Sequence, residues 1–295
     1  MEKKKLLVSF SGGQTSGYMT KLLLDNLNRD EWDMVVVFAN TGKEREETLE
    51  FVRDCDTHFG FNTVWVEAVV NPLPRKGTRH RVVAFDTANR DGQPFEDVIK
   101  KYGIPNVANP HCTRELKTNA ITSYVRRELK WKGYYTAIGI RADEIDRIDP
   151  KWEKKKYIYA LITMFPSRKP EVNQFWINQV FRLKIASYEG NCDLCYKKTD
   201  RKLMTIILES PQCVGWWAQM GDKYADFVPE SRNQDTERPV RFYRQHRSIY
   251  DLVEMAKLPF RKSRDESRDI QDAYQIDMFS ELDLSNGCSD SCEPF

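Results

Sequence analysis

The chain has 295 residues, of which 40% are hydrophobic and 31% are charged, and its formal net charge is only +2. This length and composition predict a soluble protein with a substantial core, built as one large domain or as one domain with an appendage. The sequence contains no run of about 18 apolar residues, which argues against a membrane span. The basic start is followed by a mostly apolar stretch of only five residues (6–10), too short for a signal peptide. We therefore expect a cytoplasmic protein without a membrane partner; the sequence does not indicate its oligomeric state.

The first half of the chain alternates strand-like and helix-like segments. Apolar or β-branched runs predict strands over 4–10, 34–40, 62–70 and 134–140, and helical periodicity marks 15–28, 45–59 and 113–130. Short connections between such units require parallel strands. We predict an α/β fold with a doubly wound, mostly parallel five-stranded sheet in a nucleotide-binding domain over 1–165. The proline-rich stretch 71–111 is interpreted as an insertion or lid-like loop, and 166–295 as a mainly helical, cysteine-bearing region.

A glycine pair stands where the first predicted strand ends and the first helix begins, in the segment LLVSFSGGQTSGYM. Gly12 and Gly13 lack a Cβ atom, so their backbone can turn tightly and approach an anion. Successive N–H groups at a helix N-terminus favour phosphate. Four hydroxyl side chains surround the pair and add donors: Ser9, Ser11, Thr15 and Ser16. The alternative is an ordinary strand–helix turn with a serine cap. The loop is not a Walker A motif, because Gly-Lys-Ser/Thr is missing.

Ser11-Gly12-Gly13-x-x-Ser16 after a first strand resembles the PP-loop of the adenine nucleotide α-hydrolase superfamily, a HUP-like fold. Three further segments resemble the PAPS/APS (sulfonucleotide) reductase branch of that superfamily: FANTGKEREET (38–48), CTRELK (112–117) and GIRADEIDR (139–147). Asn40 stands where that branch usually has Asp. The resemblance covers about residues 5–200.

The resemblance implies a role for each matching position. The loop would hold phosphate or sulfate oxygens, Thr41 and Gly42 would border the adenosine, and Arg141 would pair with an anionic group. Asp143 and Glu144 would orient Arg141 or bind Mg²⁺. The predicted catalytic residues are Arg141, Asp143, Glu144 and Lys117. The predicted nucleotide-binding residues are Ser9, Ser11, Gly12, Gly13, Thr15, Ser16, Asn40, Thr41, Gly42, Gly139, Arg141 and Arg147.

The chain has seven cysteines, an odd number that favours metal or redox use over disulfides. Cys192 and Cys195 form a C-x₂-C pair and Cys288 and Cys292 a C-x₃-C pair, which alone would suggest tetrahedral zinc. Cys112 opens a predicted helix, and its arrangement with the C-x₂-C pair resembles APS-type reductases. That resemblance implies a [4Fe–4S] cluster on Cys112, Cys192 and Cys195, with Cys288 or Cys292 as the fourth ligand; zinc stays open. The remaining two, Cys55 and Cys213, are expected in the core.

Three functions remain open. The first is a PAPS reductase-like enzyme, binding ATP or PAPS/APS and carrying out sulfur chemistry, although the Glu-Cys-Gly-x-His motif of true reductases is absent. The second is an AMP-forming ligase or sulfurtransferase. Its acceptor could be a nucleic acid, because four arginines three residues apart would share one face of a helix: Arg238, Arg241, Arg244 and Arg247. A solvated basic face is the alternative for them. The third function is a non-catalytic nucleotide sensor.

Overall fold

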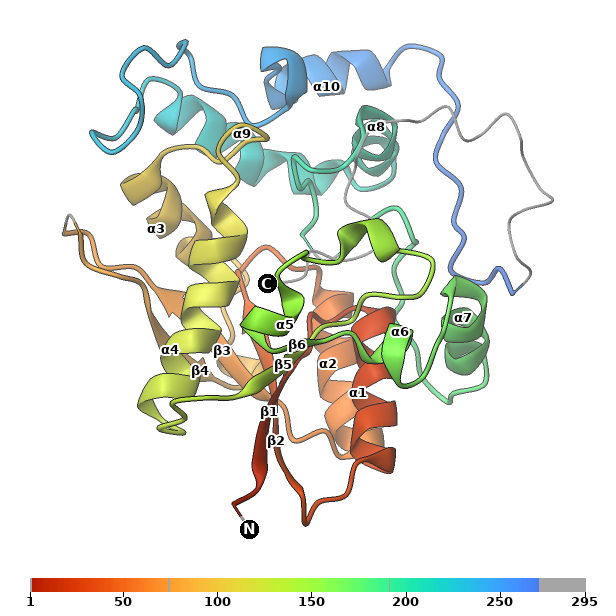
Figure 1. Cartoon of the computed structure of the whole chain (residues 1–295). Helices are drawn as coiled ribbons and strands as arrows, with labels where there is room; N and C mark the ends of the chain where they lie inside the picture. The colour runs from red at the N-terminus through yellow and green to blue at the C-terminus, as the bar shows by residue number, and fades with distance from the viewer. Residues whose placement is uncertain (1, 74, 191, 271–295) are drawn as a thin grey trace.

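A six-stranded sheet forms the centre of the chain, in a computed structural model that describes residues 2–73, 75–190 and 192–270 (Figure 1). The strand order is β4-β3-β2-β1-β5-β6, and every neighbouring pair is parallel except β3 and β4. The strands are β1 (Lys4–Ser9), β2 (Trp32–Asn40), β3 (Val64–Val69), β4 (Arg79–Val83), β5 (Tyr135–Ala137) and β6 (Tyr157–Ile158). The predicted α/β fold with a mostly parallel sheet is confirmed, whereas the predicted count of five strands is wrong.

Helices cover both faces of the sheet, because alternate residues of a strand point to opposite sides. Leu6 and Val8 of β1 pack with α1 (Gln14–Asn26), α2 (Glu46–Phe59) and α7 (Lys169–Ile177) in one apolar cluster. Leu7 belongs to a second cluster on the other face, with α3 (Gln93–Tyr102) and α4 (Asn119–Arg127). Figure 1 shows the same division, with α1 and α2 on one side of the strands and α3 and α4 on the other. The sheet is therefore doubly wound.

The later helices extend the second cluster. Figure 1 places α8 (Asp200–Glu209), α9 (Val214–Tyr224) and α10 (Ile249–Ala256) beyond the end of the sheet where the parallel strands finish. Trp217 of α9 and Leu252 of α10 are buried in the same cluster as Leu7. The core thus contains residues from both sides of the boundary predicted at 165. The remaining short elements are α5 (Trp152–Lys155), α6 (Ala160–Thr163) and four 3₁₀ turns at Phe85–Thr87, Ile145–Arg147, Pro211–Cys213 and Arg244–His246.

The stretch 71–111 is not the loop that its prolines suggested. It contains β4, the antiparallel edge strand, and α3. Strand β4 reads Arg-His-Arg-Val-Val and is mostly solvent-accessible, so it lacks the apolar pattern of a buried strand. Pro94 lies at the start of α3, where a proline is compatible with a helix.

The helix predicted over 113–130 exists with a different geometry in its first part. Residues Thr113–Thr118 form a π-helical turn that runs directly into α4.

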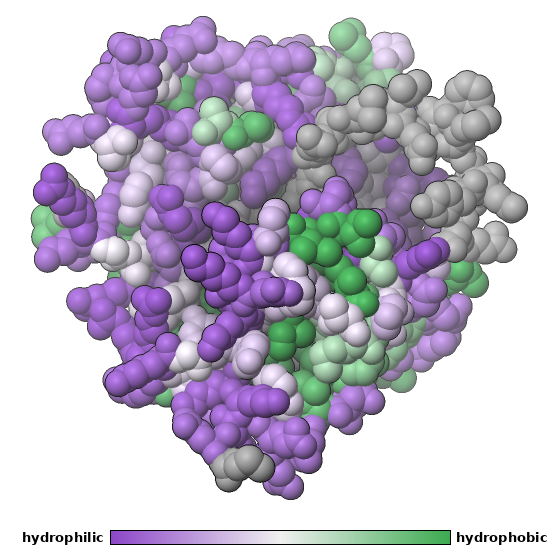
Figure 2. Space-filling model, in the orientation of Figure 1, coloured by the Kyte–Doolittle hydropathy of each residue, from purple (hydrophilic) through white to green (hydrophobic). Residues whose placement is uncertain are grey.

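Charged and polar side chains cover most of the face drawn in Figure 2, with hydrophobic residues gathered right of its centre. In the described parts of the chain, no helix combines the length and apolar character needed to cross a bilayer.

Candidate nucleotide-binding site

Steric contacts explain two glycines of the candidate site. Gly12 has φ +82°, and a Cβ atom there would lie 2.8 Å from the Thr48 Cγ2 atom of α2. Gly139 follows β5, and a Cβ atom there would lie 2.9 Å from the Cα atom of Ser16. Both distances are shorter than a carbon–carbon contact allows. Only glycine at these positions lets the loop turn sharply and lets the segment after β5 lie against α1.

The serines of the loop stabilise its shape. The Ser11 amide donates to Ser16 Oγ at 3.2 Å, the two hydroxyl oxygens are 2.8 Å apart, and Ser16 Oγ donates to the Gly13 carbonyl at 3.1 Å. Ser9 Oγ is buried and has no hydrogen-bond partner among the described residues. These serines are predicted to contact phosphate, and in the structure Ser11 and Ser16 also fix the shape of the loop.

The N-terminus of α1 is prepared for an anion. Its N-cap is Gly13, which supplies no side-chain cap, and its first turn contains no acidic residue. A helix end of this kind leaves backbone N–H groups without intrahelical acceptors and carries a partial positive charge. Gly13, Gln14 and Thr15 line a cavity at this point. The N–H groups of the predicted phosphate loop therefore border a cavity.

Arg141 brings a fixed positive charge to the same cavity. It is 5% exposed, and its Nη1 donates to Thr15 Oγ1 at 3.2 Å. Its Nε donates to Asp143 Oδ1 at 2.9 Å, and its Nη1 lies 3.6 Å from Glu144 Oε2. Arg147 pairs with the other oxygen of Glu144. These contacts fit the orienting role expected of Asp143 and Glu144.

Sequence reasoning missed part of the cavity lining. Lys169 and Asn173 of α7, together with Ser187 and Gly190, also line the cavity, and Lys169 Nζ is paired with Glu266 Oε2 at 2.8 Å. The Nε1 atom of Trp176, also on α7, donates to the Gln14 carbonyl at 2.8 Å and attaches this helix to the loop. No local signal in the sequence places α7 beside residues more than 150 positions earlier.

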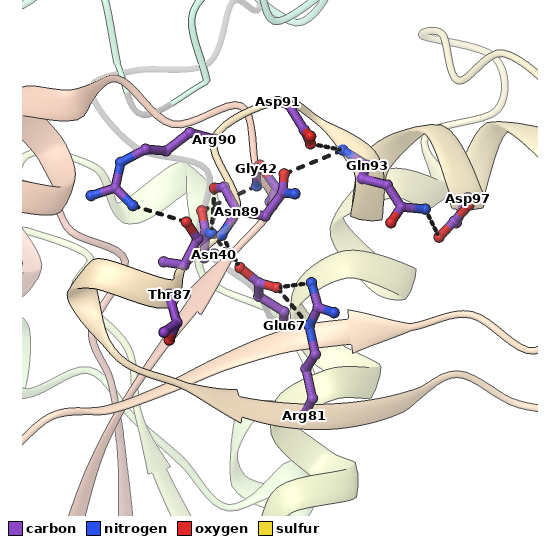
Figure 3. Close-up of polar contacts among 12 residues, drawn as sticks. Asn40, Gly42, Glu67, Arg81, Thr87, Asn89, Arg90, Asp91, Gln93 and Asp97 are labelled. Atoms are coloured by element: carbon purple, nitrogen blue, oxygen red, sulfur yellow. Dashed lines mark hydrogen bonds and ion pairs between the residues drawn. The ribbon is translucent and has the colours of Figure 1, made fainter.

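Asn40, at the end of β2, lies in a buried polar network (Figure 3). Its Nδ2 donates to Glu67 Oε1 at 2.7 Å and to the Asn89 carbonyl at 2.8 Å, and its Oδ1 accepts from the Gly42 amide at 3.1 Å. Arg81 Nε donates to the other Glu67 oxygen at 2.8 Å. An aspartate at position 40 would place a second carboxylate against Glu67. The amide is therefore suited to this network, and its polar atoms are used inside the protein.

Thr41, Glu44, Lys117 and Cys192 form a second buried group beside the end of β2. Glu44 Oε2 accepts from the Thr41 amide and hydroxyl, both at 2.7 Å. Glu44 Oε1 lies 3.6 Å from Lys117 Nζ and 4.0 Å from Cys192 Sγ. Lys117, predicted as catalytic, is buried and paired with a carboxylate. Thus Thr41 and Lys117 both surround Glu44, a residue that the sequence reasoning did not single out.

The predicted metal centre is not assembled in the described part of the chain. No three histidine, cysteine or acidic side chains there form a group that could hold a metal ion. Cys112 Sγ lies 3.3 Å from the Tyr196 hydroxyl, and burial together with the Glu44 carboxylate raises the pKa of Cys192. The described residues therefore do not provide a [4Fe–4S] or zinc site by themselves. Cys288 and Cys292 lie outside the described residues.

The remaining two cysteines occupy apolar surroundings. Cys55 of α2 is completely buried, and burial raises its pKa strongly. Cys213 is partly buried against the second cluster, and burial raises its pKa to about 11. The core position predicted for Cys55 is confirmed, and Cys213 lies at the margin of the core.

The four arginines spaced three apart do not lie on one helix. Only a 3₁₀ turn interrupts this irregular segment, and Phe242 and Tyr243 are buried in the core. Arg244 donates to the carbonyls of Lys197 and Lys198, and Arg247 pairs with Asp200. The aromatic side chains are thus not placed to stack on bases, and two of the arginines hold the C-x₂-C region in place.

Comparisons with known proteins place the chain in a family. Residues 5–149 match the phosphoadenosine phosphosulfate reductase domain. The chain is 30% identical over 292 residues to the uncharacterized nin region protein ORF290 of Escherichia phage lambda, covering 98% of this chain and 94% of that protein.

Shorter matches join the chain to larger proteins. Two uncharacterized proteins of Methanocaldococcus jannaschii are each 28% identical, over 48% and 54% of this chain, and the chain spans only 24% and 31% of their lengths. No solved structure matches. With the glycine loop, the doubly wound sheet and the Arg141 loop in place, the chain belongs to the phosphoadenosine phosphosulfate reductase domain family of the PP-loop superfamily.

Proposed function

We propose that this protein is a PAPS reductase-like enzyme that binds an adenine nucleotide with its phosphate or sulfate end at the loop 11–16. One observation carries the proposal: the uncapped first turn of α1 and the guanidinium group of Arg141 border the same cavity. Lys169, paired with Glu266, also lines this cavity. Backbone N–H groups and a planar guanidinium are the donors that phosphate and sulfate oxygens accept from most readily.

The chain's own residues would bind and orient the anion. Asp143 fixes the Arg141 fork before a ligand arrives, so little side-chain entropy is lost on binding. Reduction of a sulfonucleotide breaks its S–O bond, takes two electrons from two external thiols, which become a disulfide, and releases sulfite and the nucleotide. The positive charge of Arg141 would stabilise the negative charge that develops on the leaving phosphate oxygen.

A second candidate is AMP-forming group transfer from ATP, because the chain lacks the Glu-Cys-Gly-x-His motif of true reductases. Phosphate chemistry at the loop needs no protein thiol: an acceptor oxygen would attack the α-phosphate of ATP, pyrophosphate would leave, and a sulfur or nitrogen nucleophile would then displace AMP from the adenylated acceptor. A nucleic-acid acceptor at Arg238 and Arg241, and Mg²⁺ at Asp143, stay predictions. No step is assigned to an iron–sulfur cluster or to zinc.

Substitutions at Gly13 test nucleotide binding without disturbing the fold. Gly13 has φ −97°, so it adopts a conformation open to any residue, and Asp is a favoured N-cap. We expect Gly13→Asp to keep the melting temperature and to abolish binding of ATP and of adenosine 3′,5′-bisphosphate, because its carboxylate occupies the amides and repels phosphate. Gly13→Asn caps without a charge and should weaken binding only partly. Unchanged affinity in Gly13→Asp, measured by calorimetry, would refute the site.

Product analysis separates the candidate reactions. Purified protein is incubated with ATP and Mg²⁺, or with PAPS and a dithiol. Sulfite release supports the reductase and pyrophosphate release supports AMP-forming transfer, and Arg141→Ala should lower either rate by about 100-fold, the loss of a charged hydrogen-bond pair. Arg53→Ala, on the exposed surface of α2, serves as the control. Tight nucleotide binding without either product would favour the sensor.

A further inference from the structure

A second cavity lies apart from the nucleotide site and shares no lining residue with it. It encloses about 340 Å³, the size of a small-molecule site. Its walls come from two distant segments, the loop after α3 and residues around 232. Asn106 Nδ2 donates to the Arg241 carbonyl at 3.1 Å, and Arg232 Nη2 donates to the Ile104 carbonyl at 2.9 Å. These bonds hold the two segments together, so the cavity is part of the fold.

The lining is basic. Arg114, Arg232 and His111 contribute to it together with polar Asn109 and Ser231, and no acidic side chain of the described residues lines it. Glu115, the neighbour of Arg114 in the chain, accepts from Arg114 Nε at 2.8 Å, Thr78 at 2.6 Å and Asn119 at 3.0 Å. Burial and the two guanidinium groups lower the pKa of His111 to about 4. The cavity therefore has a positive potential around a neutral imidazole.

Two buried polar atoms on this lining have no protein partner in the described part of the chain. They are Arg232 Nη1 and His111 Nε2. A buried polar atom without a hydrogen bond has lost its contact with water and gained nothing in return, which is unfavourable. Gly103 has φ +76°, and a Cβ atom there would lie 3.3 Å from Arg232 Nη1. Glycine at position 103 thus leaves space for the Arg232 guanidinium, whose Nη1 atom has no acceptor among the described residues.

We propose that this cavity binds a phosphate monoester, with Arg232 and Arg114 on its anionic oxygens and His111 Nε2 on a hydroxyl group of the ligand. A guanidinium N–H is a strong donor to a phosphate oxygen, and Arg232 Nη1 is the nitrogen that the Ile104 carbonyl does not occupy. The ring of His111 is hydrogen-bonded to the backbone of Gly103, so Nε2 is the atom left for the ligand. The phosphate can belong to a small sugar phosphate or to the 5′ end of a nucleic-acid strand, because both carry the same group.

Histidine NMR provides a site-specific test. The full chain has four histidines, and the His111 ring signal is assigned by its loss in His111→Gln. Added inorganic phosphate should shift the His111 signal saturably while the signals of His58 and His80 move little. In Arg232→Gln, saturation should need at least about tenfold more phosphate. If the His111 signal moves no more than the other two, or if Arg232→Gln titrates like the wild type, the proposal is wrong.

A second pair of variants tests the cavity without changing Arg232. Ala108 is solvent-exposed on the rim of the cavity, so its replacement leaves the fold unchanged. Ala108→Glu should weaken phosphate binding about tenfold relative to Ala108→Gln, which has the same shape without the charge. Equal affinities would contradict the site. Gly13→Asp should leave the His111 response intact, so failure of this site and failure of the nucleotide site are distinguishable.

Ribose 5-phosphate and a 5′-phosphorylated trinucleotide identify the source of the group. A His111 shift by the sugar phosphate alone would assign a small-molecule ligand. A shift by the trinucleotide, and none by its unphosphorylated form, would assign a nucleic-acid end. If neither ligand shifts the His111 signal, the phosphate monoester proposal is refuted.

Discussion

Asn40→Asp tests whether the amide at the end of β2 is required by Glu67. Both side chains are completely buried, and the Asn40 Nδ2 and Glu67 Oε1 atoms are 2.7 Å apart. Two carboxylates about 3 Å apart repel each other by about 5 kcal/mol at an effective dielectric constant of about 20. Binding one shared proton relieves the repulsion. At pH 7, protonating a carboxyl group of ordinary pKa costs about 4 kcal/mol of free energy.

We therefore expect Asn40→Asp to lower the free energy of unfolding by about 4 kcal/mol at pH 7. The folded variant binds a proton that the unfolded chain releases, so its stability rises as the pH falls. The difference from wild type should shrink by about 1.4 kcal/mol for each pH unit down to about pH 5. Urea denaturation of both proteins at several pH values measures this slope.

Two controls separate charge repulsion from a general loss of packing. The double variant Asn40→Asp/Glu67→Gln restores an amide–carboxylate pair with the roles exchanged and should recover most of the lost stability. Asn71→Asp keeps the oxygen that accepts from the Leu73 amide and should change stability little. An Asn40→Asp variant as stable as wild type at pH 7, or equally destabilised at every pH, would refute the reasoning.

Two further predictions concern the loop and the buried thiol. Gly12→Ala should destabilise the fold by about 2–3 kcal/mol and weaken nucleotide binding, because φ is +82° and the new Cβ atom meets Thr48. Gly60→Ala is the control: Gly60 has φ +65° but lies in open space, so this variant should lose only about 1 kcal/mol. Equal melting temperatures of the two variants would contradict this prediction. Cys192 in the native protein should react with iodoacetamide at pH 8 at least about tenfold more slowly than in urea, because burial and the Glu44 carboxylate raise its pKa. Mass spectrometry of the alkylated peptides measures both rates, and rapid native labelling of Cys192 would show that the thiolate is accessible.

The sequence alone determined the features whose causes are local. The glycine pair between an apolar strand and a helix predicts the phosphate loop, since the backbone turn depends on steric contacts within a few residues. A continuous β-branched run predicts the buried parallel strand β2, and apolar segments predict β1 and β3. The motif after β5 predicts that Asp143 orients Arg141, a contact between residues two positions apart.

Only the tertiary structure decided which distant side chains meet. Arg141 reaches Thr15 across 126 residues, and Trp176 attaches α7 to the loop across 162 residues. The sequence did not predict strand β4, because an edge strand exposes polar side chains and lacks the apolar pattern of a buried strand. The role of Asn40 depends on Glu67 of the neighbouring strand, and Cys192 lies beside Glu44 instead of in a group of cysteines. Such contacts depend on how helices and strands pack against each other, and the spacing of residues along the chain does not predict them.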